Sequence, residues 1–253
     1  MYIDSETRNY YQNHATFYGG ESFIYKKGNL LYKIFDENLI QSTYRKERMI
    51  PLIQKENLRD VGQIPYDILE DKNKNVIGVL LPYIEGIRMG KYLKKMNDVE
   101  IFLKLSKLLE RFHKEQVSLI DVNLNNFIVT PKRNLVAIDL TSVYINNYQS
   151  NVCSDMILDF YDNSYLYLEY FANYIDKVSL YLLYLNYITR KEFHKYKGDI
   201  YFDKIEQLNL NNDLLKIYIE IKETLLCSSD VPYLHEIMSK EALEEQKTRI
   251  LRV

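Results

Sequence analysis

Short apolar runs alternate with polar turns over the first 84 residues, and this pattern predicts a β-sheet. Apolar residues also recur at helical spacing over 38–54, although Pro51 should end or kink that helix. Lys26-Lys27-Gly28 predicts the turn of a hairpin, and 71–75 predicts a second turn. The strands are predicted over 23–25, 29–35, 66–70 and 76–81. We therefore expect a sheet of four or five strands that carries one helix.

After Gly86 the pattern becomes mostly helical. Apolar residues recur three and four apart over 98–114, which predicts an amphipathic helix with Asp98 as its N-cap. Two short β-like runs, 119–130 and 135–140, surround a turn at 131–134. The remaining helices are predicted over 155–188, 204–226 and 232–251. We expect two lobes, a β-rich lobe over 1–84 and a helical lobe over 85–253.

Composition narrows the classes of protein. A length of 253 residues suits one large domain or two lobes, and the net charge of −2 offers no general attraction to nucleic acid or to an anionic membrane. Two cysteines are too few for a disulfide framework or a four-cysteine zinc site, and they indicate a reducing compartment. The longest uncharged apolar stretch, 178–188, is shorter than the roughly 20 residues that a bilayer requires. With no legible secretory signal, a cytoplasmic location is expected.

Candidate chemistry lies in 119–141. Asp121, Asn126 and Asp139 sit at the ends of short predicted strands. Mg²⁺ prefers hard oxygen ligands such as carboxylates and amide carbonyls, together with nucleotide phosphates. Phosphoryl transfer also needs a carboxylate that is not tied to the metal, because the attacking hydroxyl must be oriented. The same residues could instead be turn residues, which their types also favour.

Upstream, Lys33 lies within an apolar strand, which is an awkward place for an ammonium group unless it has a partner. Glu47, in the predicted helix, is the obvious partner. A structural ion pair is the alternative interpretation of these two residues. Their order ahead of the Asp121, Asn126 and Asp139 pattern favours a functional one.

Taken together, these residues resemble the protein kinase-like superfamily over about residues 17–175. The resemblance implies a bilobal α+β fold that binds ATP and Mg²⁺. Lys33 is similar to the lysine that contacts the nucleotide phosphates, and Glu47 to the glutamate that holds that lysine. Asp121 is similar to the catalytic-loop aspartate, while Asn126 and Asp139 are similar to the two metal ligands.

The resemblance extends to the adenine site and the phosphate loop. It implies that Leu81 is the gatekeeper and that the carbonyl of Pro82 and the amide of Ile84 meet the adenine edge. Gly19 and Gly20 are similar to a reduced Gly-rich loop, although a simple turn is the alternative. Phe112-His113 matches the helix end that commonly precedes the catalytic loop.

The chain also departs from the family pattern. Leu119-Ile120 replaces the usual His-Arg, Asn123 stands where Ser/Thr kinases carry a lysine, and Asp139-Leu140-Thr141 replaces Asp-Phe-Gly. No Ala-Pro-Glu closes the segment. The expected function is therefore phosphoryl transfer from ATP to a hydroxyl, with a protein Ser/Thr acceptor as the first choice. A small-molecule kinase of the aminoglycoside or choline kinase type, and a pseudokinase that acts as a binding module, remain as alternatives. A predicted helix over 236–251 could also dock a partner.

Overall fold

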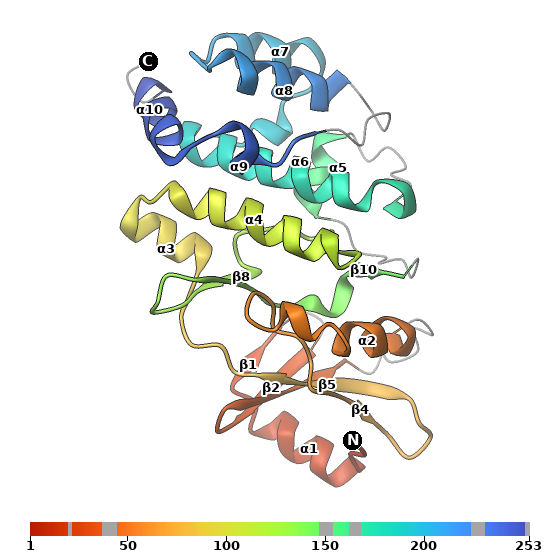
Figure 1. Cartoon of the computed structure of the whole chain (residues 1–253). Helices are drawn as coiled ribbons and strands as arrows, with labels where there is room; N and C mark the ends of the chain where they lie inside the picture. Colours follow the sequence, from red (N-terminus) through yellow and green to blue (C-terminus); the bar gives the residue numbers. More distant parts are fainter. Residues whose placement is uncertain (20–21, 37–44, 147–153, 162–167, 224–230, 251–253) are drawn as a thin grey trace. The chain divides into compact units, whose positions relative to one another are not determined.

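The computed structural model describes the chain except for residues 20–21, 37–44, 147–153, 162–167, 224–230 and 251–253. Its described part is a mixed α/β structure with a small antiparallel sheet and many helices (Figure 1). The chain divides into two compact units: residues 1–86 with 136–141, and residues 87–135 with 142–253. The sequence-based division after residue 84 assigned 136–141 to the second lobe, whereas those residues belong to the first unit.

The first unit contains a five-stranded antiparallel sheet in the order β1-β2-β3-β5-β4. The predicted hairpins are present, but β2 runs through Lys26 and Lys27, so only Gly28 and Asn29 form the turn. Gly28 has a φ of 60°, which glycine adopts without strain in tight hairpin turns. The strands are β1 (Phe17–Tyr18), β2 (Ser22–Lys27), β3 (Leu30–Phe35), β4 (Asp67–Glu70) and β5 (Val76–Pro82).

Helix α2 (Arg45–Ile53) corresponds to the later part of the helix predicted over 38–54, whose beginning lies outside the described residues. Pro51 lies inside α2 and does not end it. A short 3-10 helix, η2, follows at Glu56–Leu58. Helix α1 (Ser5–Asn13) was not predicted, because it buries no residue and carries no apolar stripe. Its N-cap Asp4 accepts a hydrogen bond from the amide of Thr7 at 2.7 Å.

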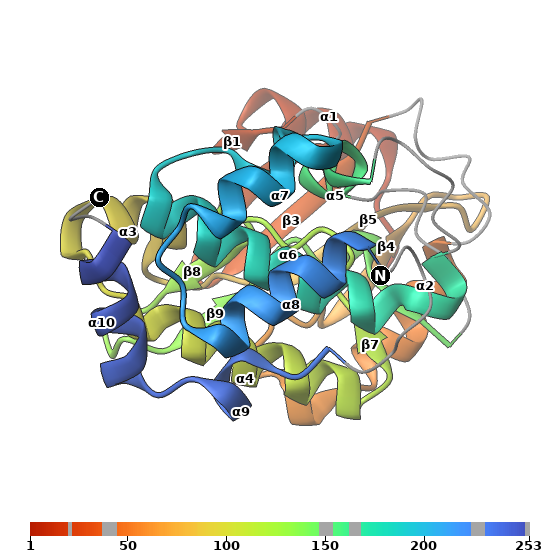
Figure 2. The ribbon, with the colours of Figure 1, turned by 90° about the horizontal axis from the view of Figure 1, so that it is seen from above.

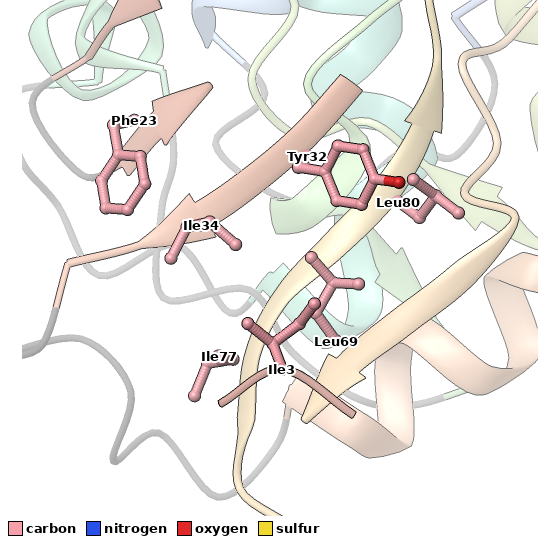
Figure 3. Close-up of a cluster of buried hydrophobic side chains, with 7 residues drawn as sticks. All are labelled: Ile3, Phe23, Tyr32, Ile34, Leu69, Ile77 and Leu80. Atoms are coloured by element: carbon pink, nitrogen blue, oxygen red, sulfur yellow. The ribbon is translucent and has the colours of Figure 1, made fainter. Parts of the chain in front are cut away.

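One core cluster of the first unit gathers apolar side chains from the N-terminal segment and four strands, as Figure 3 shows. Tyr11 of α1 packs against this cluster and stacks on Tyr25, with ring centroids 4.7 Å apart. Burial raises the pKa of Tyr11 to about 12. Aromatic contacts therefore hold a mostly polar helix on the sheet. The cluster consists of Ile3, Phe23, Tyr32, Ile34, Leu69, Ile77 and Leu80.

The second unit is mainly helical. Its longest helix, α6, packs against α4, and α10 lies against both (Figures 1 and 2). The helix predicted over 204–226 is two helices, and so is the one predicted over 232–251. The helices are α3 (Met89–Met96), α4 (Glu100–Lys114), α5 (Asp155–Phe160), α6 (Leu168–Thr189), α7 (Gly198–Glu206), α8 (Asn212–Glu223), α9 (Leu234–Ile237) and α10 (Lys240–Ile250), with the 3-10 helix η4 (Phe193–Lys195). A further 3-10 helix, η3 (Leu140–Ser142), begins in the segment 136–141 of the first unit.

Two local expectations for the second unit need correction. Asp98 is not the N-cap of α4, a position that Val99 takes; its carboxylate instead accepts from the amide of Glu100, from Tyr92 and from Arg133. The strand predicted over 119–130 is a loop up to residue 126. The short strands are β6 (Ile87–Arg88), β7 (Val117–Ser118), β8 (Phe127–Val129) and β10 (Tyr144–Ile145), together with β9 (Leu135–Ala137), whose last two residues belong to the first unit.

Helix α10 uses one face within its own chain, since Leu243, Gln246 and Lys247 are buried. Docking of a partner on its remaining face stays a prediction. Among the described residues, no helix combines the length and the apolar character that crossing a membrane demands.

Candidate functional site

Lys33 lies in the middle of β3, where its neighbours across the sheet are Ile24 and Val79. Its side chain is only 9% exposed, yet the ammonium group donates hydrogen bonds to the Asp139 carboxylate and, at 3.1 Å, to the hydroxyl of Thr141. The Thr141 hydroxyl in turn donates to Asp139 Oδ1 at 3.1 Å. These three residues, called the Lys33 cluster below, all belong to the first unit. Sequence reasoning selected Lys33 and Asp139 and missed Thr141.

The expected ion pair between Lys33 and Glu47 is not formed. Glu47 is exposed on α2, and Lys33 pairs with Asp139 instead. The physical reason is the course of the backbone before Asp139. Ala137 donates to the carbonyl of Val61 and accepts from the amide of Gln63, both at 2.8 Å, which fixes the segment 136–141 within the first unit.

Asp139 itself has a φ of 60°. This left-handed conformation is one that Asp and Asn adopt more readily than other non-glycine residues. Its side chain is half-exposed, so the carboxylate pairs with Lys33 while part of it still faces solvent. An exposed carboxylate beside a buried cation could meet a second cation or a ligand group without a large desolvation cost.

Asp121 and Asn126 meet in the second unit, on the loop between β7 and β8. The Asn126 side-chain amide donates to Asp121 Oδ2 at 2.8 Å and to the Asp121 carbonyl at 3.1 Å. Asn123 donates to the other carboxylate oxygen, Oδ1, at 3.0 Å. Farther along the loop, Arg88 donates to the carbonyl of Asn125. The loop thus holds the Asp121 carboxylate at both oxygens and leaves Asn126 Oδ1 without a donor among the described residues.

The backbone just before Asp121 is anchored by a residue that the sequence did not single out. Asp176 of α6 is fully buried, and its carboxylate accepts from the amides of Leu119 and Ile120, both at 2.7 Å. It also contacts Nε2 of His113, on α4, at 2.9 Å. Ile120 has a φ of 64°, a strained conformation for a β-branched residue. A buried anion therefore stabilises a strained turn that positions Asp121.

The predicted adenine-binding segment follows β5 in the first unit. Leu81 is buried and pairs with Leu31 of β3. The carbonyl of Pro82 accepts from the Gln63 side chain at 2.8 Å, a contact that sequence reasoning missed. A carbonyl has two lone pairs, so it can accept one more hydrogen bond. The amide of Ile84 donates to none of the described residues and could bind a ligand.

Gly19 follows β1 in the turn that leads to β2, and its amide donates to the carbonyl of Ser22 at 2.9 Å. This amide is therefore already used within the turn. Gly19 and Ser22 help to line a cavity of about 460 Å³ on the first unit. Gly20 lies outside the described residues.

The predicted metal ligands are of residue types that Mg²⁺ accepts. No group of three or more His, Cys, Asp or Glu residues that could hold a metal exists within the described ranges. Mg²⁺ does not need such a cage, because it keeps several waters and often takes only one or two protein ligands beside phosphates. Asp139 supplies a carboxylate, and Asn126 an amide oxygen whose own NH₂ group is engaged elsewhere. Because these residues belong to different compact units, their convergence stays a prediction.

The residues that the sequence analysis missed, Asp176, Thr141 and Gln63, differ in how clearly the sequence indicated them. Asp176 carried a signal, because it is the only carboxylate in the mostly apolar stretch 170–188 of a predicted helix and so required a partner if buried. Thr141 was noted only as a departure from a family glycine, and nothing local pointed to Gln63. A comparison of the sequence with the models of known protein families finds no match, and no curated protein matches it either.

Proposed function

We propose that the protein is an ATP- and Mg²⁺-dependent phosphotransferase with a bilobal kinase-like fold, which transfers the γ-phosphoryl group to a hydroxyl. The observation that carries the proposal is the contact between Lys33 and Asp139, which are 106 residues apart in the chain. The resemblance implies a phosphate-binding role for Lys33 and a metal-binding role for Asp139, and the two side chains are in direct contact. A lysine on an interior strand beside a half-exposed carboxylate has the charges that a metal-bound triphosphate requires.

Each residue of the candidate site has a distinct task in this proposal. Lys33 donates hydrogen bonds to phosphate oxygens. Asp121, held at both oxygens by Asn123 and Asn126, accepts a hydrogen bond from the acceptor hydroxyl and then its proton. The Asp176 anchor fixes the backbone that carries Asp121, so less reorganisation is needed when the substrate binds.

Asp139 and Asn126 would hold the magnesium ion. When bound, the ion neutralises charge that develops on the phosphates during transfer. Adenine would lie beside the Pro82 carbonyl and the Ile84 amide, with Leu81 behind it. Lys33 would exchange part of its contact with Asp139 for the triphosphate.

The acceptor is proposed to be a Ser or Thr hydroxyl of a protein, and a small-molecule hydroxyl is the alternative. Asn123 bears on this choice. It stands where Ser/Thr kinases carry a lysine that neutralises the transferred group. Here its side chain donates to Asp121 and accepts from the amide of Asn125, and so helps to position Asp121. No cation from this position would assist transfer, which favours the small-molecule alternative.

A second candidate function is a binding module that does not catalyse transfer. Three observations favour it: Lys33 is paired with Asp139 and Thr141, Glu47 is exposed, and the Gly19 amide is used within its own turn. A pair that neutralises itself in this way offers less charge to a nucleotide.

Nucleotide binding is measured first and phosphoryl transfer second. Thermal unfolding with millimolar ATP and Mg²⁺ tests binding, because a ligand at 100 times its Kd stabilises the folded state by about 2.7 kcal/mol. Radiolabelled ATP with protein and metabolite pools then tests transfer. We expect Lys33→Met and Asp139→Asn to abolish both signals, and Asp121→Asn to abolish transfer while binding persists.

Lys27→Met, on the neighbouring strand β2 and exposed, is the matched control and should behave as the wild type. A melting temperature that ATP does not move would refute the phosphotransferase. Binding without transfer to any pool would instead support the binding module.

A further inference from the structure

The second unit contains a cavity of about 410 Å³ where α3 and α6 end and α10 passes. Its polar lining residues are Lys94, Asn97, Tyr187, Arg190 and Lys247, together with Asn186. None of them belongs to the candidate site described above. The lining includes three cations and no carboxylate.

Lys247 is the most unusual member of this lining. Its side chain is only 9% exposed, although an ammonium group has three N–H donors and is costly to bury without partners. Among the described residues it donates one hydrogen bond, to the carbonyl of Asn97 at 2.9 Å. The carboxylate of Glu244 is 3.8 Å away, beyond hydrogen-bonding distance. The buried ammonium thus retains unused donors beside the cavity.

The other two cations have no carboxylate partner within the described residues. Lys94 lies in the last turn of α3, and Arg190 directly follows α6. Lys247 lies in the last turn of α10. The carbonyl end of a helix carries roughly half a negative charge, which suits each of the three cations but supplies no ion-pair partner for Lys94 or Arg190. Asp98 directly follows the lining residue Asn97 in the chain, but its carboxylate is already paired with Arg133 at 2.8 Å.

Asn97 adds a neutral donor. Its Oδ1 accepts from the Tyr187 hydroxyl at 2.8 Å, which directs the remaining NH₂ group away from that bond. Asn97 adopts the left-handed conformation at the C-cap of α3, which brings its carbonyl to Lys247. The cavity is thereby bordered by one amide donor and three cationic groups.

We propose that this cavity binds a phosphorylated small molecule. Phosphate oxygens accept hydrogen bonds from several directions, and guanidinium and ammonium groups are their usual partners. The volume exceeds that of a single phosphate and falls within the range of small-ligand sites, so it leaves space for an organic body. The proposal does not rest on the proposed phosphotransferase activity.

Calorimetric titration with pyrophosphate tests the proposal. The titration uses the Lys33→Met protein, so that any binding at the candidate nucleotide site is removed. We expect one binding event that Arg190→Gln and Lys94→Gln each weaken by about tenfold, since both residues are exposed and their replacement should not disturb folding. Lys91→Gln, an exposed lysine on the same helix that does not line the cavity, is the control and should change the affinity less than twofold.

Absence of heat at millimolar pyrophosphate would overturn the proposal. So would an equal loss of affinity in Lys91→Gln and Lys94→Gln, because that result would indicate a diffuse charge effect. A folded Lys247→Met protein should no longer bind pyrophosphate.

Discussion

Replacing Asp176 with Asn should destabilise the second unit severely, although the two side chains have nearly the same volume. The Asp176 carboxylate receives the amide of Ile120 at Oδ1, and the amide of Leu119 together with His113 at Oδ2. An asparagine offers one oxygen only. Its NH₂ group must therefore face at least one N–H donor that the carboxylate now accepts.

The magnitude follows from the bonds that are lost. A hydrogen bond to a charged group contributes about 1.5–3 kcal/mol, and an unpaired buried N–H costs about 1–3 kcal/mol. Relief of the desolvation cost of the carboxylate offsets part of this sum. We expect a net loss of about 3 kcal/mol, a large share of the 5–15 kcal/mol that stabilises a typical domain.

Urea unfolding followed by circular dichroism measures this loss, with the exposed Asp203→Asn as the matched control. With a slope of about 2 kcal/mol per molar urea, the midpoint should fall by roughly 1.5 M. Amide exchange at Leu119 and Ile120 should accelerate more than exchange elsewhere, because Ile120 can then relax from its positive φ. A loss below 1 kcal/mol with unchanged slope, or uniform acceleration of exchange, would refute the reasoning.

Three further predictions concern other parts of the chain. Thr141→Val removes the hydroxyl that joins the Lys33 cluster and should weaken Mg·ATP binding about three- to tenfold, with Thr141→Ser restoring it; equal affinity in the Val variant would contradict this role. Gly78→Ala should lower the melting temperature far more than Gly28→Ala, because its Cβ would lie 2.3 Å from the Lys33 carbonyl oxygen, whereas Gly28 only has a φ of 60°. Burial lowers the pKa of His194, so the unfolded chain takes up a proton first and stability should fall as pH drops below about 6.5; His194→Gln should remove that part of the pH dependence, and an unchanged profile would contradict it.

Local patterns predicted the elements whose apolar residues face one core. The strands β2 to β5 and helix α4 follow directly from such patterns, since alternation or helical spacing records which face is buried. Helix α1 was missed because aromatic stacking on a neighbouring strand, and no stripe of its own, holds it. Helices α7 to α10 were merged in pairs, because the predicted apolar spacing continues across their junctions.

The candidate site divides in a similar way. The types and order of Lys33, Asp121, Asn126 and Asp139 were visible in the sequence, because charged and amide groups beside apolar strands are conspicuous. The partner of Lys33 was not visible, because Glu47 and Asp139 were both candidates. The hydrogen bonds of Ala137, which fix the backbone before Asp139, decided between them. Such long-range competition leaves no local trace.

The return of residues 136–141 to the first unit bears on how this protein can be made. During translation, residues 1–86 are synthesised well before Ala137, whose hydrogen bonds to Val61 and Gln63 complete the first unit. Until the intervening segment has emerged, the backbone groups of Val61 and Gln63 that later bond Ala137 therefore face water. A fragment ending at Gly86 would lack its closing segment, and any attempt to express the sheet by itself should append 136–141 through a linker.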